Sequence, residues 1–307
     1  MEIIKTIMEI QQSPPYASYI KSLGWQVEKI DGSNLFLKHF PLLGGFAKLQ
    51  RCTKLPETSK LFPVLSKYHV KRLSVEPDSG IPQHTFSAWV KIVSSHIPII
   101  STHYISTKTI RVDLDGSDEE IFARFSEAKR RAVRRAQKAG VSVTESSDIK
   151  ALLKIKNKSA GFLGFITTYG TDKLWPLFTP DHSTILLASA SNVIARSFTT
   201  RQSLEIASPS ARNDDRIVGG ILLLFWDHVA YYWIAGATKE GKRMFAPTLL
   251  VWEALKLAKK RGMKTFDFIG VWDERIPKEN KAWLGFTKFK EGFGGKSLYY
   301  PIATPRR

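Results

Sequence analysis

Hydrophobic and polar positions alternate in short runs through the first hundred residues, as they do in half-buried strands. Residues 34–40 (NLFLKHF) and 46–52 (FAKLQRC) both show this alternation, and the turn-forming sequence PLLGG separates them. Residues 81–100 combine a helical segment with a closing apolar run, and several prolines divide the region into short elements. The pattern therefore predicts a first unit of mixed strands and helices.

A helical period follows a predicted strand over residues 109–116. Ser117 and Glu120 have the spacing of a capping box, and Gly140 suits the position after the last helical turn. One face of the intervening segment is apolar and consists of Ile121, Phe125, Ala128, Ala132, Ala136 and Ala139. The spacing predicts one continuous helix over residues 117–140.

In the remainder of the chain, segments with helical spacing of apolar residues alternate with strand-like apolar runs. A second clear helix is predicted over residues 246–263, because Pro247 suits a first helical turn and Gly262 suits a stop. A further helix is expected over 150–161, a short helix before 285, and an exposed polar loop over 199–215. The predicted strands are 183–191, 216–226, 229–238, 265–270 and 297–302.

Strand hairpin, helix, strand, helix, strand is the element order of the second half of a GNAT acyltransferase fold. A coenzyme A user of that fold needs a glycine-rich turn before the long helix, so that backbone N–H groups can hold the pyrophosphate. The corresponding turn, TKEGKRMFAP (238–247), has one glycine and carries the bulky side chains Met244 and Phe245. The turn therefore argues against coenzyme A.

Composition narrows the class of protein. Apolar residues make up 43% of the 307 residues, enough for a sizeable core, and the single cysteine, Cys52, excludes an internal disulfide framework. The first fifteen residues show no basic region followed by a long apolar core, so no secretory signal is expected, and the longest apolar run, 217–226, is shorter than the roughly 20 residues of a membrane helix. We expect a cytoplasmic protein without a transmembrane segment.

A formal net charge of +18 predicts a polyanionic partner, which could be nucleic acid, an anionic membrane surface or a phosphorylated substrate. The polar face of the predicted helix 117–140 holds the densest cationic stripe, made of Arg130, Arg131, Arg134, Arg135 and Lys138. Two interpretations remain open for the stripe: contact with a polyanion, or a solvated face whose cations suit the dipole at the C-terminal end of the helix.

Motifs spread through nearly the whole chain resemble the Fem family of peptidoglycan interpeptide-bridge aminoacyltransferases. The most specific are the basic sequence KRRAVRRAQKAGVSV (129–143) and FTKFKEGFGG (286–295), which places Lys290 between Phe289 and Phe293. The other matching stretches are QSPPYASYIKSLGW (12–25), KRLSVEPD (71–78), TIRVDL (109–114), YYWIAGAT (231–238), APTLLVWEALKLAKKRG (246–262) and FDFIG (266–270). No heptad insertion follows the basic helix, so the chain resembles the compact members without a coiled-coil arm.

The resemblance implies an α/β (α+β) chain with two GNAT-like acyltransferase domains in tandem, with mixed central sheets flanked by helices, over residues 1–107 and 108–307. It also implies an aminoacyl-tRNA donor and a UDP- or lipid-linked muramyl peptide acceptor. The implied activity transfers an amino acid from the tRNA ester to an amine of the stem peptide. No metal and no organic cofactor are expected. We expect a monomer with peripheral contact to anionic membrane.

The resemblance also implies the catalytic residues. Lys290 matches the family lysine that stabilises the oxyanion of the tetrahedral intermediate, and Phe289 matches its neighbour. A lysine between aromatic rings is partly desolvated, which strengthens its field and shifts its pKa. The glycines around it would leave room for the tRNA 3′ end. Asp267 is a candidate base or orienter, or a carboxylate capping the following turn, and His103 and His228 are further candidates.

The remaining residues concern substrate binding. Compact members of the family hold the acceptor diphosphate with a lysine from the first domain and an arginine from the second. Lys29 or Lys38 can supply the first cation, and Lys173 is the nearest cation to the second position. Phe245 stands where the family has a tyrosine and is assigned to the substrate, and the stripe Arg130, Arg131, Arg134, Arg135 and Lys138 is assigned to tRNA.

Two other functions are consistent with the same sequence. The first is an acyl-coenzyme A N-acyltransferase of the GNAT superfamily, which the missing diphosphate arginine favours and the bulky turn at residues 238–247 disfavours. The second is a non-catalytic RNA-binding module that keeps the fold for its basic surface, which predicts salt-sensitive tRNA binding without turnover.

Overall fold

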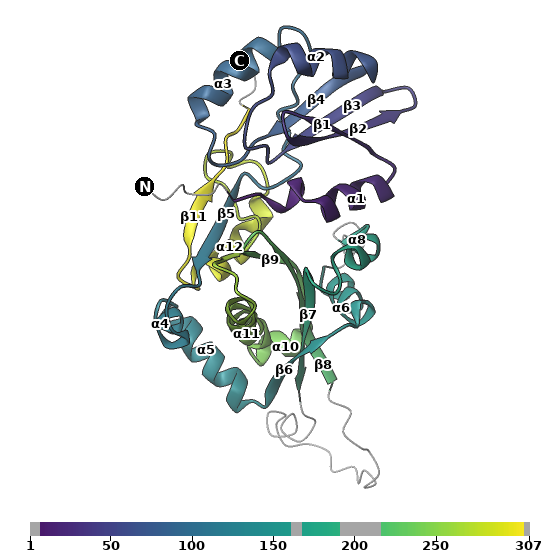
Figure 1. Cartoon of the computed structure of the whole chain (residues 1–307). Helices are drawn as coiled ribbons and strands as arrows, with labels where there is room; N and C mark the ends of the chain where they lie inside the picture. Colours follow the sequence, from purple (N-terminus) through teal and green to yellow (C-terminus); the bar gives the residue numbers. More distant parts are fainter. Residues whose placement is uncertain (1–6, 161–167, 191–215, 304–307) are drawn as a thin grey trace.

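The computed structural model describes residues 7–160, 168–190 and 216–303. Two β-sheets lie one above the other, and helix α1, Pro14–Ser22, lies between them (Figure 1). The upper sheet is built from the first part of the chain. The lower and larger sheet contains every later strand, so the polypeptide forms two layered units joined through α1.

The upper sheet has four strands in the order β1-β2-β3-β4, with β3 and β4 parallel. Its elements are β1 Gln26–Ile30, β2 Ser33–Phe40, β3 Gly44–Gln50, β4 Val70–Glu76, and the helices α2 Thr58–Lys67 and α3 Gln83–Val93. The predicted strands β2 and β3 are confirmed. The first five residues of β2 are all buried rather than alternating, because α2 and α3 cover one face of the strand while Phe36 packs toward α1 from the other.

The lower sheet has seven strands in the order β11-β5-β10-β9-β8-β7-β6. These strands are β5 Lys108–Asp113, β6 Val141–Ser146, β7 Ser183–Ala190, β8 Arg216–Trp226, β9 Val229–Ala237, β10 Thr265–Asp267 and β11 Lys296–Tyr299. Asp227 and His228, both with positive φ, form the tight turn between β8 and β9. The strand predicted over 265–270 ends three residues early, at Asp267.

Helices cover both faces of the lower sheet. One face is covered by α5, Glu127–Lys138, and α11, Ala246–Lys260, whose apolar side chains share a core with alternate residues of the strands. The other face is covered by α6, Ile149–Ala160, and α8, Thr171–Phe178, together with α1. The shorter elements are η1 Ile10–Gln12, α4 Asp118–Ala123, α10 Lys239–Arg243, η3 Lys281–Trp283 and α12 Leu284–Glu291.

The continuous helix predicted over residues 117–140 is wrong: the segment forms two helices, α4 and α5. The capping box of Ser117 and Glu120 is present, and Gly140 has the expected left-handed φ. Ser126 interrupts the helix and accepts a hydrogen bond from the backbone N–H of Lys129, so it begins α5 as a second cap. Ala128 is consequently exposed, and Val133 joins the buried face in its place.

Both ends of the described chain cross between the two units. Tyr16 of α1 shares a core with Leu174 of α8, and Ala303 packs in the core of the upper sheet. All strands of the upper sheet precede residue 107 and all strands of the lower sheet follow it. A division into residues 1–107 and 108–307 remains a proposal, because residues at the two chain ends belong to the opposite unit.

Among the helices described, none has the length and apolar character needed to cross a membrane.

Candidate functional site

The lower sheet separates at its centre, between β9 and β10. These parallel strands pair over three positions, from Thr265 opposite Val229 to Asp267 opposite Tyr231. The regular strand ends at Asp267, and Ile269 and Gly270 both have positive φ, although the N–H groups of Phe268 and Val271 still donate to carbonyls of β5. β9 continues to Ala237 paired with β8 but no longer with β10, so the two halves of the sheet part after Asp267.

Lys290 lies at this point of separation. It belongs to α12, so the first part of the motif FTKFKEGFGG is helical. The side chain is buried, with 7% of its surface exposed. Its Nζ donates hydrogen bonds to the carbonyl oxygens of Phe268 at 2.8 Å, Ile269 at 2.7 Å and Gly270 at 2.7 Å. A side chain from the C-terminal segment therefore fixes the loop that follows β10.

The aromatic rings around Lys290 differ from those predicted. Its Nζ lies 5.0 Å from the ring centroid of Phe286 and 5.8 Å from that of Tyr232. The cation beside Phe289 and Phe293 is instead Lys129 of α5, whose Nζ lies 3.8 Å and 5.1 Å from their centroids. The prediction that Phe289 and Phe293 enclose Lys290 is wrong. Phe289 and Lys290 are successive residues of α12 and point in different directions, and Phe293 lies beyond the helix, against Phe125 and Phe268.

Burial affects both lysines. Desolvation lowers the pKa of Lys290 to about 7, partly offset by the charge of Asp267, and it lowers the pKa of Lys129 to about 8. The three carbonyl oxygens around Lys290 act in the opposite direction, because only the protonated amine has three N–H groups to donate to them. The protein thus holds an ammonium group in a desolvated position.

The glycines of the motif have an intramolecular explanation. A Cβ on Gly292 would lie 2.8 Å from Lys129 Cε, and a Cβ on Gly294 would lie 2.6 Å from the carbonyl oxygen of Arg124. Gly294 also has a φ of +77°. These glycines allow the chain after α12 to pass close to the start of α5. Packing within the protein therefore explains them without a tRNA 3′ end.

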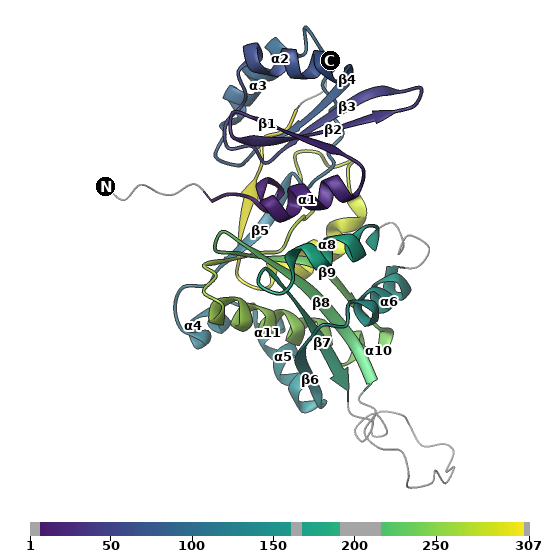
Figure 2. The same ribbon diagram turned by 45° about the vertical axis from the view of Figure 1, so that its right-hand side comes forward.

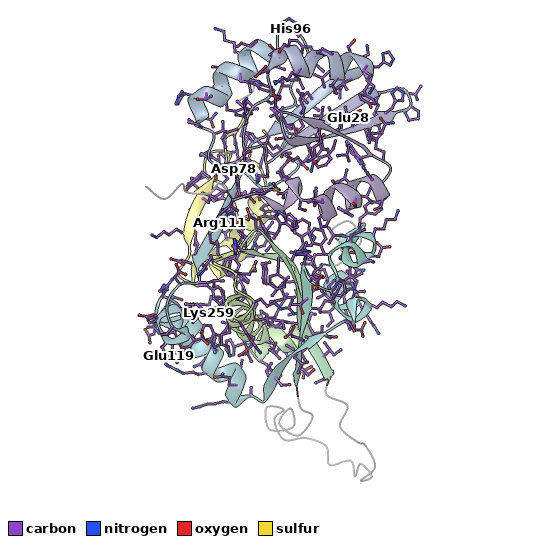
Figure 3. The ribbon with its side chains drawn as sticks, in the orientation of Figure 1. Glu28, Asp78, His96, Arg111, Glu119 and Lys259 are labelled. Atoms are coloured by element: carbon purple, nitrogen blue, oxygen red, sulfur yellow. The ribbon has the colours of Figure 1, made fainter. Side chains whose placement is uncertain are left out.

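Asp267 is fully engaged within the protein. Its carboxylate accepts hydrogen bonds from Thr109 Oγ1 at 2.5 Å, from Arg111 Nε at 2.7 Å and from the backbone N–H of Ile269 at 2.8 Å. The last bond is the turn cap considered from the sequence. Arg111, on β5 of the lower sheet, also pairs with the buried Glu9, and Figure 3 shows it in the part of that sheet nearer the upper unit. Asp267 therefore ties the loop after β10 to the junction of the two units.

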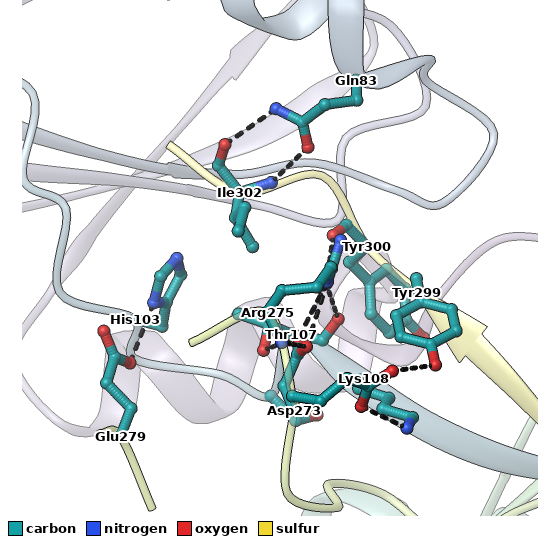
Figure 4. Close-up of polar contacts among 12 residues, drawn as sticks. Gln83, His103, Thr107, Lys108, Asp273, Arg275, Glu279, Tyr299, Tyr300 and Ile302 are labelled. Carbon is teal, nitrogen blue, oxygen red and sulfur yellow. Dashed lines mark hydrogen bonds and ion pairs between the residues drawn. The ribbon is translucent and has the colours of Figure 1, made fainter. Parts of the chain in front are cut away.

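The two histidines lie in different surroundings. His103 Nδ1 is 3.0 Å from Glu279 Oε2, close to a network formed by Thr107, Asp273 and Arg275 (Figure 4). His228 lies in the β8–β9 turn, where its carbonyl accepts from the N–H of Lys264 just before β10 begins. Lys290 binds the residues after β10 ends, so His228 lies at the opposite end of that strand.

The structure brings Lys38 and Lys173 together. Lys38 Nζ donates to the carbonyl oxygen of Leu23 at 2.9 Å, and Lys173 Nζ donates to that of Ser22 at 3.4 Å. Both cations, one from each unit, are thus held at the C-terminal end of α1, where carbonyl groups and the helix dipole attract positive charge. Lys38 also lines a cavity of about 280 Å³. Lys29, by contrast, is exposed on the edge strand β1.

Four residues of the cationic stripe, Arg131, Arg134, Arg135 and Lys138, are exposed on α5. Arg130 behaves differently: its guanidinium donates to the carbonyl oxygens of Ala123 and Phe125, at the break between α4 and α5. Arg130 therefore stabilises the break, and the four exposed residues form the surface that a polyanion can reach. We call these four residues the basic face of α5.

The turn before α11 does not leave room for a phosphate at its glycine. A Cβ on Gly241 would lie 2.2 Å from the carbonyl oxygen of Val218, so this glycine serves packing against β8. Phe245 is the N-cap residue of α11, has a φ of 59°, and lies under the guanidinium of Arg135 at 5.7 Å.

In the described residues, no group of three or more His, Cys, Asp or Glu side chains is placed to hold a metal ion.

Lys129 is the site residue that sequence reasoning missed. A usable signal was present: Lys129 precedes the buried Ala132 and Val133 by three and four residues, which places it on the buried side of α5. The stripe predicted from the sequence began at Arg130 and left Lys129 without a role. The helical position separates Lys129 from the exposed residues of the basic face.

The family described as an acetyltransferase (GNAT) domain matches residues 123–276, about half of the chain. The chain therefore belongs to the GNAT acetyltransferase family. The prediction that it is a transferase is confirmed at that level.

A curated relative is the Lipid II:glycine glycyltransferase of Staphylococcus haemolyticus (strain JCSC1435). It is 26% identical over 243 residues, which cover 64% of this chain and 57% of the relative. The chain thus spans little more than half the length of this relative. The name of the relative and the structural match to FemX confirm the predicted resemblance to the Fem family.

Solved structures support the fold. The crystal structure of FemX superimposes with a TM-score of 0.71 at 17% identity, over 96% of this chain and 91% of that chain. The C-terminal domain of a putative lysylphosphatidylglycerol synthetase from Agrobacterium fabrum gives a TM-score of 0.52 at 12% identity, over 94% and 86%. The predicted fold class, an α/β chain of tandem GNAT type with helices flanking mixed sheets, is confirmed.

Proposed function

We propose that the protein is a tRNA-dependent aminoacyltransferase that adds an amino acid to the stem peptide of a peptidoglycan precursor. The observation that carries the proposal is the buried ammonium group of Lys290 at the point where β9 and β10 separate. The glycyltransferase relative supports the reaction class. A desolvated cation at such a position favours a reaction in which a neutral carbonyl oxygen becomes negative.

The reaction joins the acceptor amine to the carbonyl carbon of the tRNA ester. The new C–N bond forms, the C–O bond to the ribose breaks, and the proton lost by the amine ends on the ribose oxygen. The intermediate carries an oxyanion, which would replace one of the three loop carbonyls as an acceptor for Lys290 Nζ. Asp267 acts as a positioning residue, because it fixes Ile269, one of the residues whose carbonyl holds Lys290.

Lys38 and Lys173 are proposed to hold the diphosphate of the acceptor. Their ammonium groups share one end of α1, where they bind the neighbouring carbonyl oxygens of Leu23 and Ser22. Bonds to neutral carbonyls are weaker than charge-assisted bonds to phosphate, so a diphosphate can displace them. The missing diphosphate arginine is thereby replaced by a lysine from α8. Phe245, at the N-cap of α11, is assigned to the substrate as a proposal that rests on the resemblance.

The basic face of α5 is proposed to contact the tRNA. Its four cations are exposed and aligned on one helix that packs against α11. Phosphate contacts by Arg and Lys make binding strongly dependent on salt. Lys129, on the buried side of the same helix, contacts Phe289 of α12. This contact joins α5, which carries the basic face, to the helix that carries Lys290.

Transfer of a radiolabelled amino acid tests the proposal. The full chain is incubated with a panel of charged tRNAs and with UDP-linked and lipid-linked muramyl peptide. The expected result is label in the stem peptide of one acceptor with one or more charged tRNAs. Absence of transfer to both acceptors across the panel contradicts the function.

The same preparation distinguishes the two alternative functions. Calorimetry with acetyl-coenzyme A would reveal micromolar binding for an acyl-coenzyme A transferase, which the packing of Gly241 and Phe245 disfavours. Salt-sensitive tRNA binding without transfer would indicate a non-catalytic RNA-binding module.

A further inference from the structure

The tip of the β2–β3 hairpin exposes two leucines. Leu42 is fully exposed and Leu43 is 70% exposed, and Leu42 has a φ of 70°, in the left-handed region that a leucine seldom adopts. The hairpin projects from the upper sheet in both views (Figures 1 and 2). The protein thus holds two large apolar side chains away from its own surface, on a backbone that opposes the ordinary preference of leucine.

Basic residues surround this tip. Residues 33–50, which form the hairpin, contain Lys38, His39 and Lys48 and no Asp or Glu. At the start of the neighbouring strand β4, Lys71 and Arg72 are exposed. The side chain of Lys71 lies directly against Gly44, because a Cβ on that glycine would be 2.7 Å from Lys71 Cγ. The apolar tip therefore has a positively charged base.

A cavity of about 250 Å³ lies at the base of the hairpin, and Leu43 and Arg72 both line it. Trp25 and Tyr104 line the same cavity, and Lys48 Nζ lies 4.7 Å and 4.2 Å from their ring centroids. Tyr104 is about half exposed. Tryptophan and tyrosine suit a boundary between water and lipid, because each has an apolar ring and a polar group.

We infer that the β2–β3 hairpin docks the protein on an anionic phospholipid bilayer, with Leu42 and Leu43 inserted among the acyl chains. The basic residues at the hairpin base then lie at the headgroups, and charge complementarity favours anionic lipid. A second protein surface would need a matching acidic rim, whereas a bilayer supplies both the apolar interior and the negative charge. Docking does not depend on aminoacyl transfer, so each can fail without the other.

Docking would also place the upper sheet at the surface where a lipid-linked acceptor resides. The cavity that holds Lys38 and the cavity beside Leu43 both include Phe46. A headgroup held in the bilayer would therefore approach the lysine at the end of α1 from the side of the hairpin. This consequence favours a lipid-linked over a nucleotide-linked acceptor, and it rests on the proposed function.

Sedimentation with lipid vesicles tests the docking. The wild-type chain and the variants L42S/L43S, K71A/R72A and I92S are mixed with phosphatidylcholine vesicles that contain or lack phosphatidylglycerol. Ile92 is a matched control, because it is 55% exposed on α3, away from the hairpin. We expect wild-type and I92S to bind the phosphatidylglycerol vesicles. Binding should fall about tenfold for each leucine replaced and about fivefold for each cation removed.

Three results would overturn the inference. The first is failure of the wild-type chain to sediment with phosphatidylglycerol vesicles. The second is equal binding by wild-type and L42S/L43S. The third is a change from dimer to monomer in the L42S/L43S variant without any loss of vesicle binding, which would assign the leucines to self-association. Thermal melting of each variant checks that the exposed substitutions leave the fold intact.

Discussion

The two sheets use lysine in opposite ways. In the upper sheet, Lys38 and Lys48 lie over aromatic rings at the margins of open cavities, with Lys38 bonded to a single backbone carbonyl. At the lower sheet, Lys290 of α12 is buried and all three of its N–H groups donate to carbonyl oxygens. Lys38, like Lys173 of α8, is thus exchangeable, whereas Lys290 is fixed.

The difference has a physical consequence for each task. A half-exposed lysine bonded to one carbonyl can move to a phosphate at small cost, because water solvates the group that it leaves. A buried lysine that leaves its carbonyls strands up to three acceptors without partners. The upper arrangement therefore suits reversible binding of an anion. The lower arrangement suits a cation that is held in one place, where the developing oxyanion needs to replace only one of the three carbonyl acceptors.

Removal of the fixed charge should have the largest effect. Lys290→Met is expected to lower the rate of transfer by about 10²–10³, because an oxyanion donor is lost. It should also lower the free energy of unfolding by about 1–3 kcal/mol, since loop carbonyls lose their partner. Single-turnover transfer and thermal melting measure the two effects. Lys288→Met, at an exposed position on the same helix, should change neither. A Lys290→Met enzyme with wild-type turnover would exclude Lys290 from the mechanism.

Removal of the exchangeable charges, Lys38 and Lys173, should weaken binding of the acceptor rather than slow the transfer step. The Lys38→Ala and Lys173→Ala variants are each expected to raise the KM for the acceptor about 10- to 100-fold with little change in kcat, since a charge-assisted hydrogen bond to phosphate is lost. Steady-state kinetics with varied acceptor measures this. Lys29→Ala is the matched control, because Lys29 is exposed on the neighbouring strand β1. An effect of Lys29→Ala as large as that of Lys38→Ala would reject the assignment.

The pH dependence of the transfer rate should reveal the titration of Lys290. Burial lowers the pKa of Lys290 to about 7, whereas an unfolded lysine titrates near 10.4. Above pH 7 the folded protein loses the cation, so transfer should decline about tenfold per pH unit. In the same range the unfolded state binds more protons, so the contribution of Lys290 to stability should rise with pH. In Lys290→Arg the charge persists, and the decline should disappear from the rate profile.

The basic face of α5 should determine how strongly tRNA affinity depends on salt concentration. Removal of Arg134 and Arg135 together is expected to reduce the slope of log affinity against log salt by roughly 1.5, at about 0.7–0.9 for each lost phosphate contact. Filter binding over a salt series measures the slope. Arg130→Ala provides the contrast: it should lower the melting temperature and leave the slope unchanged, because Arg130 binds the carbonyls of Ala123 and Phe125.

Lys129 should show the smallest effect. Its Nζ lies over Phe289, and a cation–π contact contributes roughly 0.5–2 kcal/mol, but burial of the charge costs a similar amount. Replacement by leucine is therefore expected to change the free energy of unfolding by about 1 kcal/mol or less. Urea denaturation measures it. A loss as large as that of Lys290→Met would mean that Lys129 also carries a fixed charge essential to the fold.

Local periodicity was enough to predict most elements. The strands at 216–226 and 229–238 and the turn between them follow from two apolar runs with a short polar break, and the helix at 246–263 follows from helical spacing, Pro247 and Gly262. The helix 117–140 was predicted as continuous because both of its halves keep the helical period. The break at Ser126 depends on Arg130, which folds back to bind the carbonyls that the break leaves free.

The amino-acid sequence by itself determined the order and type of these elements, the basic character of α5 and the presence of a lysine near the C-terminal end. Only the tertiary structure decided that Lys290 meets three carbonyls, that Lys129 takes the place beside Phe289, and that Lys38 and Lys173 share one end of α1. The reason is that hydrophobic period is a property of neighbouring residues. The partner of a charged group, by contrast, is set by segments far away along the chain.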